Sequence, residues 1–159
     1  MAETAEQARL AQLELLGDAT EFAGRIHGLI TCSPLFENFN LAEIRELSRF
    51  MRVYRAEPGA EIIGEGQSGD FMVLLIEGMI GTWKSFGEMS MIDGEQRFAS
   101  CIAAESCLVA VLSRESLARI ILEQPTLGAK VLMELVLMLS QRLRQTSTKL
   151  VAFMDRERS

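Results

Sequence analysis

A short stretch of the chain carries a glycine, a carboxylate and an arginine in an order that suits a sugar phosphate. Glu88 follows Gly87 directly, and Arg97 comes nine residues after Glu88. A glycine lets the backbone approach a ligand closely, and a helical turn that starts there directs free N–H groups at an anion. A guanidinium pairs with a phosphate through two parallel hydrogen bonds, and a carboxylate accepts one from a sugar hydroxyl. The alternative is a Glu88–Arg97 ion pair across a turn.

The other reactive side chains exclude several kinds of chemistry. His27 is the single histidine, which argues against a multi-histidine metal centre and a Ser-His or Cys-His catalytic pair. We therefore expect no metal and no enzyme activity. Cys32, Cys101 and Cys107 are odd in number and have no C-x-x-C spacing, which favours reduced thiols over a disulfide framework. Without a signal peptide or a membrane span in the sequence, we expect a cytoplasmic protein with no membrane contact.

The length and the net charge of the chain limit the classes of partner that it can bind. The 159 residues are enough for one domain, and 16 Lys and Arg against 22 Asp and Glu give a net charge of −6. A general nucleic-acid binder needs a basic surface, so no direct DNA binding is expected. One small anion site is still compatible with this charge.

The predicted elements run from helices through a β-rich middle to two final helices, an α+β order. Before the β-rich part we predict an amphipathic helix over residues 3–16, a capping box from Asp18 to Glu21, a turn at Ser33-Pro34, and a helix over residues 41–50 capped by Asn40. Short apolar runs separated by glycines predict strands at residues 52–54, 61–63, 71–76, 97–103 and 107–112. Ser113 is predicted to cap a helix over residues 114–123, and Pro125 to separate it from a long helix over residues 126–154.

The long helix has a narrow stripe of residues in alternating steps of four and three. The stripe consists of Leu132, Val136, Leu139, Leu143, Thr146, Leu150 and Phe153. This pattern is typical of helices that pair along their length, and it predicts a homodimer through residues 132–153. The alternative is that the stripe packs on its own domain. Thr146 within it either sets register or meets a ligand, or its hydroxyl bonds to its own helix carbonyl.

The segment FGEMSM, IDGEQ, RFAS resembles the phosphate-binding cassette of the cyclic nucleotide-binding domain family, roughly F-G-E-[small apolar]-A-[apolar], a loop, then R-x-A-[ST]. The glycines of EPGAEIIGEGQSGDFMVLLIEG are similar to that family's turns, and SPLFENFNLAEIRELS to its preceding helical element. The resemblance runs over about residues 33–155. It implies an eight-stranded β-roll, a jelly-roll barrel, flanked by N-terminal helices and two C-terminal helices. Three parts follow: an N-terminal helical extension (1–32), the β-roll with short flanking helices (33–125), and a long dimer or lid helix (126–159).

The same resemblance implies cyclic AMP or cyclic GMP as ligand. It implies that Arg97 contacts the cyclic phosphate and Glu88 the ribose 2′-OH, with backbone amides completing the cradle. The implied cassette residues are Phe86, Gly87, Glu88, Met89, Ser90, Arg97, Phe98, Ala99 and Ser100. In several members a Thr or Ser after the arginine is associated with cyclic GMP. Phe98 stands there, which favours cyclic AMP, and we expect Phe98 to be a packing residue.

The last helix supplies a second resemblance. LRQTSTKLVAFMD is similar to the dimer helix of the bacterial catabolite activators, which implies that Thr146 and Ser147 contact the adenine. The expected role is a regulatory sensor that signals through its C-terminal helices to an unknown protein partner. The alternatives are a degenerate fold that serves only dimerisation or docking, and the sensor fragment of a transcription regulator.

The sequence departs from the family pattern in two places. Only GTWKS separates Ile80 from Phe86, where the family usually has about two strands. Either the deletion is real, or a hairpin is missing from the sequence as given. The chain also ends nine residues after Leu150, so the expectation is a sensor without a helix-turn-helix domain.

Overall fold

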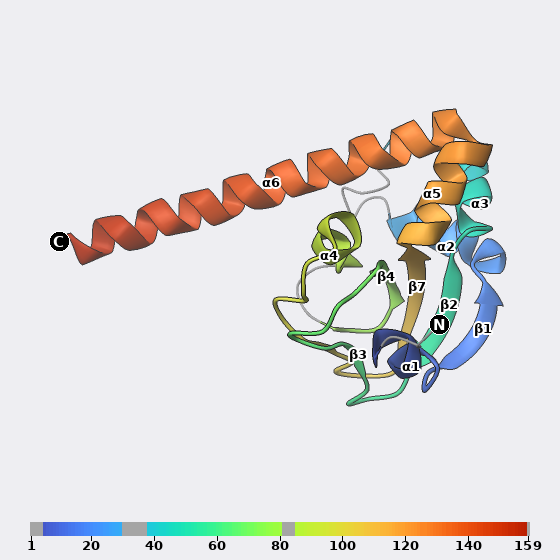
Figure 1. The fold of residues 1–159 in the computed structure, drawn as a ribbon, viewed down its shortest axis with the longest axis horizontal. Helices are drawn as coiled ribbons and strands as arrows, with labels where there is room; N and C mark the ends of the chain where they lie inside the picture. Colours follow the sequence, from blue (N-terminus) through green and yellow to red (C-terminus); the bar gives the residue numbers. More distant parts are fainter. Residues whose placement is uncertain (1–4, 30–37, 81–84, 159) are drawn as a thin grey trace.

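The central strands of the fold are β4 (Phe71–Glu77) and β7 (Cys107–Ser113), which pair antiparallel with Val73 opposite Val111. The computed structural model describes residues 5–29, 38–80 and 85–158 (Figure 1). Cys32, the turn at Ser33-Pro34, and residues 81–84 of the shortened segment lie outside these ranges.

Two antiparallel sheets form the roll. The larger has the order β1-β2-β7-β4-β5, and the smaller pairs β3 with β6. Their remaining strands are β1 (Glu14–Asp18), β2 (Arg52–Ala56), β3 (Glu61–Ile63), β5 (Ser85–Phe86) and β6 (Cys101–Ile102). The predicted α+β roll with flanking helices is confirmed. The described residues contain seven strands, of which β2–β7 lie within the implied roll and β1 comes from the part expected to be helical.

The central strands are apolar on both faces because each face covers a different core. Along β4, Met72 and Leu74 point to a cluster shared with the helices, whereas Phe71 and Val73 point to a cluster inside the roll. Successive side chains of a strand alternate between the two faces of a sheet. Burial on both sides therefore explains the unbroken apolar run at residues 71–76.

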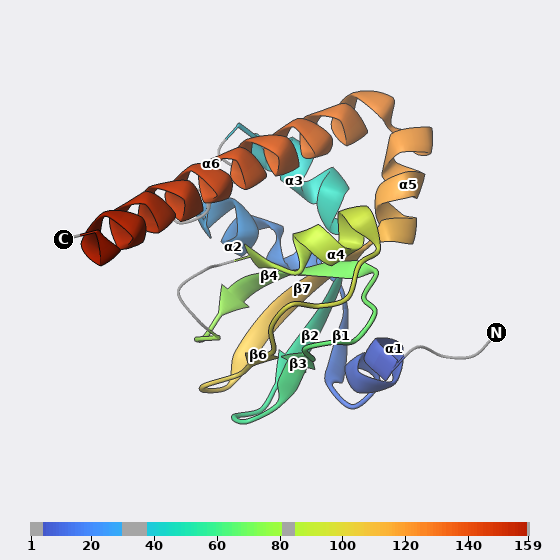
Figure 2. The same cartoon turned by 60° about the vertical axis from the view of Figure 1, so that its left-hand side comes forward.

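Helices cover one face of the larger sheet (Figures 1 and 2). They are the 3-10 turn η1 (Thr20–Phe22), α2 (Ala23–Gly28), α3 (Leu41–Ser48), α4 (Glu88–Asp93), α5 (Arg114–Glu123) and α6 (Pro125–Glu157). A further helix, α1 (Ala5–Leu10), lies apart from them beside β3 (Figure 2). The predicted caps of two helices are confirmed. Asn40 and Glu43 form a reciprocal capping box on α3, and the Ser113 hydroxyl accepts from the Ser116 N–H at 3.0 Å at the start of α5.

The prediction of one helix over residues 3–16 is wrong beyond Leu10. Residues 14–18 instead form β1, which pairs with β2 in a register that places Leu15 opposite Tyr54. A free edge of β2 offers a ladder of backbone hydrogen bonds, and this tertiary pairing outweighs local helix propensity. Asp18 also differs from the prediction, because its carboxylate accepts from the Thr20 N–H at 2.8 Å and forms a local turn without a capping box. The strand predicted at 97–103 is confined to Cys101–Ile102.

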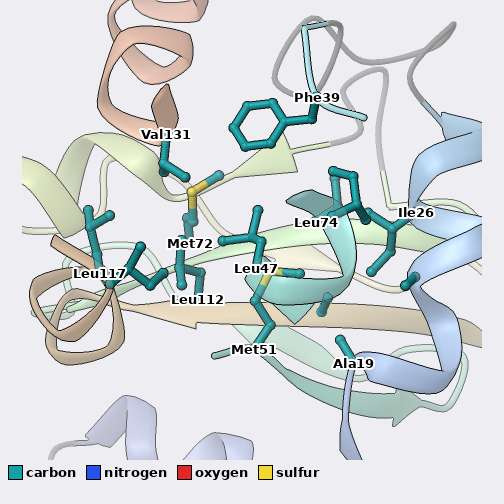
Figure 3. Close-up of a cluster of buried hydrophobic side chains, with 14 of the residues drawn as sticks. Ala19, Ile26, Phe39, Leu47, Met51, Met72, Leu74, Leu112, Leu117 and Val131 are labelled. Carbon is teal, nitrogen blue, oxygen red and sulfur yellow. The ribbon is translucent and has the colours of Figure 1, made fainter. Parts of the chain in front are cut away.

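The first and second halves of α6 have different surroundings. In the first half Leu127, Val131, Leu135 and Met138 are buried in the helix-covered core, and Figure 3 shows Val131 beside Met72 in that cluster. The second half extends away from the body (Figure 1). Its stripe residues Leu143, Leu150 and Phe153 are each more than half exposed. The alternative that this stripe packs on its own domain is therefore wrong for this part of the helix.

None of the helices within the described ranges combines the length and the apolar character needed to cross a membrane.

Candidate functional site

A cavity of about 250 Å³ lies between residues 86–100, which we call the cassette, and α6. The cassette contributes Phe86, Gly87, Glu88, Met89, Ser90, Arg97, Phe98 and Ala99. The facing side of α6 contributes Arg142, Gln145, Thr146 and Lys149, and Ile63 and Cys101 complete the lining. The structure thus brings together, in one cavity, sequence segments that are about fifty residues apart.

Two of the eleven predicted site residues do not line this cavity. The Ser100 hydroxyl accepts from the Glu65 N–H at 3.0 Å and donates to Glu61 Oε1 at 2.8 Å, so it ties the cassette to the roll. Ser147 is exposed on α6. Phe98 lines the cavity but is 79% exposed, so the expectation that it is a packing residue is wrong.

Glycine is required at two positions because the Arg97 side chain passes close to the backbone there. Gly87 has a φ of +80°, and a Cβ on it would lie 2.6 Å from Arg97 Nη1. A Cβ on Gly69 would lie 2.1 Å from Arg97 Nε. These contacts explain why the glycine before Glu88 is needed, beyond the close approach of a ligand.

Arg97 is held almost completely by the protein itself. Its Nε donates to Glu6 Oε1 at 2.7 Å and its Nη2 to Glu6 Oε2 at 3.0 Å. Its Nη1 donates to the Gly87 carbonyl at 2.7 Å, and Nη2 also donates to the Phe71 carbonyl at 2.6 Å. The guanidinium carbon lies 4.9 Å from the centre of the Phe71 ring. Arg97 pairs with Glu6, so the Glu88–Arg97 ion pair considered from the sequence is not formed.

Only one of the two carboxylate oxygens of Glu88 has a hydrogen-bond partner among the described residues. Its Oε1 accepts from Arg142 Nη1 of α6. Its Oε2 is buried and has no hydrogen-bond partner among the described residues. A buried acceptor without a partner costs about 1–3 kcal/mol, so this atom is suited to a donor supplied by a ligand.

The helix that begins at Glu88 is also fixed at its other end. Arg114, the first residue of α5, donates from Nε to the Met91 carbonyl at 2.6 Å and from Nη2 to the Ser90 carbonyl at 2.9 Å. A cation at the last carbonyls of a helix stabilises its C-terminal end. As a result α4 is connected to α5 through Arg114 and to α6 through Glu88.

Two further groups set the polarity of the cavity. Lys149 is exposed and makes no ion pair with any described residue, so its charge is available to an anion. Burial raises the pKa of the Cys101 thiol, while nearby Arg97 acts in the opposite direction. The thiol is therefore a neutral part of the lining at pH 7. The described residues contain no cluster of three or more His, Cys, Asp or Glu side chains arranged for a metal ion.

Sequence reasoning found Thr146 but missed Arg142, Gln145 and Lys149 on the same face of α6, and it missed the partner of Arg97. Residues 142, 145, 146 and 149 follow the helical spacing of three and four, so a polar stripe beside the apolar one was a readable signal. No such signal exists for Glu6, which lies 91 residues from Arg97 in the sequence.

Comparison with known proteins then relates this geometry to a family. No protein-family model matches the chain. A crystal structure of a cyclic nucleotide-binding domain from Methylobacillus flagellatus has 31% sequence identity and a TM-score of 0.78, and the match covers 89% of each chain. The chain belongs to the cyclic nucleotide-binding domain family.

One further solved structure and one further protein sequence are similar to this chain. The catabolite activator protein of Thermus thermophilus matches this cyclic nucleotide-binding domain at 25% identity and a TM-score of 0.68, over 77% of this chain and 63% of the other. A cyclic nucleotide-gated potassium channel of Mesorhizobium japonicum is 34% identical over 98 residues, which is 55% of this chain. The chain spans only 27% of the length of that channel.

Proposed function

We propose that this domain is a non-enzymatic regulatory module of the cytoplasm that binds a cyclic nucleotide, preferably cyclic AMP, between the cassette and α6. The observation that carries the proposal is the unpartnered, buried Oε2 of Glu88. A ribose 2′-OH is a neutral donor that would satisfy it. Arg97, Lys149 and the first N–H groups of α4 would take the cyclic phosphate.

The preference for cyclic AMP is proposed from Phe98. No hydroxyl follows Arg97 to bond a guanine, and the largely exposed ring at the cavity lining offers an apolar face to a base. Thr146 lines the same cavity from α6 and would meet the base from the other side.

The proposed signal is a change in the position of α6. Ligand contacts on Glu88 act directly on its partner Arg142 of α6, and a shift of α4 acts on α5 through Arg114. A ligand changes helix packing only if it binds the two arrangements differently. Different contacts of Glu88 with and without ligand would provide that difference.

The proposal is tested by thermal unfolding with cyclic AMP and cyclic GMP. A ligand at about 100 times its dissociation constant stabilises the fold by about 2.7 kcal/mol. We expect a shift with cyclic AMP at lower concentration than with cyclic GMP. Phe98→Thr should improve cyclic GMP relative to cyclic AMP, and Phe98→Ala is the matched control that removes the ring without adding a hydroxyl. No shift with either nucleotide at millimolar concentration would contradict the proposal.

Pairing with a second copy along the exposed stripe of α6 belongs to the same proposal. Leu143, Leu150 and Phe153 are apolar and exposed on a helix that extends from the body. Ser147, which does not line the cavity of its own chain, would then face the second copy. Sedimentation should show a dimer that Leu143→Glu converts to a monomer, and the same change at Leu122, 81% exposed on α5, should leave the dimer intact. A wild-type monomer at all accessible concentrations would contradict pairing.

One observation favours a second candidate function, a fold that has lost nucleotide binding and serves only for docking. Glu6 already occupies two donor groups of Arg97, the residue expected to take the phosphate. The thermal-unfolding experiment distinguishes the two functions. Neither candidate needs DNA binding by this chain, and the downstream protein partner would contact α6.

A further inference from the structure

The carboxylate that neutralises Arg97 comes from outside the cassette and outside the roll. Glu6 lies on α1, a helix of six residues, and its side chain has no exposed surface. It pairs with Arg97 side-on, through Nε at 2.7 Å and Nη2 at 3.0 Å. This two-bond arrangement is the one that a guanidinium also makes with a phosphate.

Few of the N–H groups of Arg97 remain free to donate to a ligand. A guanidinium has five N–H groups. Four of those of Arg97 donate to Glu6, Gly87 and Phe71, two of them to Glu6. The remaining N–H is on Nη1, so no pair of parallel donors is left. A cyclic phosphate can therefore make a two-bond contact with Arg97 only if another acceptor leaves.

The geometry indicates which acceptor leaves. The Phe71 carbonyl belongs to a central strand that the sheet fixes, and the Gly87 carbonyl is held in the first turn of α4, where it also accepts from the Met91 N–H at 3.2 Å. Glu6 is not among the residues that line the cavity, although Arg97 is. The edge of Arg97 that carries the two parallel donors thus faces α1, and it must turn away from Glu6 to face the cavity.

The attachment of α1 is limited enough to be reversible. Besides the Glu6–Arg97 pair, it includes the Arg9–Glu61 ion pair at 3.0 Å and the side chain of Leu10 in the roll's core. The docking is incompletely satisfied, because Arg9 Nη1 is buried without a hydrogen-bond partner among the described residues. A buried ion pair carries the cost of removing both charges from water. A phosphate that takes the place of the carboxylate keeps Arg97 paired while Glu6 regains its hydration, so the exchange leaves no unpaired buried charge.

We propose that Glu6 is a tethered competitor of the cyclic phosphate: ligand binding transfers the Nε–Nη2 edge of Arg97 from Glu6 to the phosphate and releases α1 from the roll. This inference rests on the proposed function, because it takes Arg97 as the phosphate contact. It makes α1 a determinant of ligand affinity and a second moving part besides α6.

The test compares cyclic AMP affinity, by calorimetric titration of the full chain, between the wild type and Glu6→Gln. The amide keeps the size of the side chain and removes the charge, so we expect binding about tenfold tighter, as expected for loss of a competing charged hydrogen-bond partner. Glu14→Gln is the matched control. It removes the same charge from the same end of the chain, where Glu14 pairs with Arg55 at the surface, and it should leave the affinity unchanged.

The outcomes separate this inference from the function on which it rests. If the wild type binds and Glu6→Gln binds equally or more weakly, Glu6 holds Arg97 in place and the competition is refuted while the proposed function stands. If only Glu6→Gln binds at millimolar concentration, the competition is supported, while the proposed function fails for the wild type, which Glu6 then holds in a non-binding state. If neither protein binds either cyclic nucleotide at millimolar concentration, the proposed function fails and the competition fails with it.

A measurement on the wild type avoids any effect of the substitution on folding. Amide hydrogen exchange should become faster at residues 5–10 when cyclic AMP saturates the protein, while exchange at residues 86–99 becomes slower. Slower exchange at residues 5–10 on ligand binding would show that α1 stays docked, and would overturn the proposal.

Discussion

Glu88 and Arg97 are equally buried, at 3% exposure each, but opposite parts of the molecule hold them. Arg97 is held by α1, through both oxygens of Glu6. Glu88 is held by α6 through one oxygen, and its other oxygen has no described partner. Glu88 therefore keeps a free acceptor for a ligand, whereas the paired donors of Arg97 are occupied by the protein's own carboxylate. Under the proposed function these are the residues for the ribose and for the phosphate.

The largest effect is expected on the α1 side. Arg97→Met leaves Glu6 as a buried charge without its partner, which should cost about 3–5 kcal/mol in the free energy of unfolding. The double variant Glu6→Gln/Arg97→Met removes both charges and should recover most of that loss. Neither should bind cyclic AMP. Denaturant unfolding and titration check both effects, and retained binding in the double variant would show that Arg97 is not the phosphate contact.

On the α6 side, the docked half of the helix should determine stability. Leu135 is 1% exposed in the core, so Leu135→Ala should cost about 2–5 kcal/mol. Leu122→Ala makes the same change at an exposed position of α5 and should stay within about 0.5 kcal/mol. Urea unfolding of both variants measures the difference. Equal losses would mean that α6 is not anchored by its first half.

A smaller effect is expected where the ribose meets Glu88. Glu88→Gln should weaken cyclic AMP binding about tenfold, because a hydrogen bond to a charged group is worth about 1.5–3 kcal/mol. With 2′-deoxy cyclic AMP the wild type should lose a similar factor. Because both changes remove the same hydrogen bond, the two losses should not add. Fully additive losses in the titrations would place the ribose elsewhere.

The smallest effect concerns the ion pair that joins α6 to α3. A hydrogen bond from Lys130, followed by the Asn40 N–H, lowers the pKa of Glu43 below its ordinary 4.5. Because the folded-state pKa is the lower one, the pair stabilises the fold above pH 4.5 and this contribution is lost as the pH falls further.

Glu43→Gln should therefore reduce the loss of stability below pH 4.5. The side chains of Lys130 and Glu43 are 33% and 30% exposed, so the difference should stay below about 1 kcal/mol. Urea midpoints at several pH values measure it. Glu105→Gln, at an exposed position with no ion pair among the described residues, is the control that should leave the pH dependence unchanged.

The cassette was predictable because its chemistry is local. Gly87 and Glu88 are neighbours, and their turn and short helix need no distant partner to form. The same holds for the caps at Asn40 and Ser113, whose bonds are three residues long. The helical period of α6 also placed Thr146 within its stripe, where a polar residue was expected either to set register, to meet a ligand or to bond to its own helix, and Thr146 does line the cavity.

Prediction from the sequence failed where the conformation or the bonding of a residue depends on a partner far away along the chain. Residues 14–16 continue the helical pattern of the residues before them, but pairing with the free edge of β2 determines the conformation of residues 14–18. Phe98 was expected to pack, but the cavity leaves its ring exposed. The Glu6–Arg97 and Arg142–Glu88 pairs bridge 91 and 54 residues, so neither has a sequence spacing that could reveal it.

The sequence by itself determined the family, the two-sided apolar strands, and which residues form the cassette, because each depends on neighbours along the chain. Only the tertiary structure decided the state of the site. A buried charge takes the partner that folding brings to it, and folding brings Glu6 to Arg97 and Arg142 to Glu88.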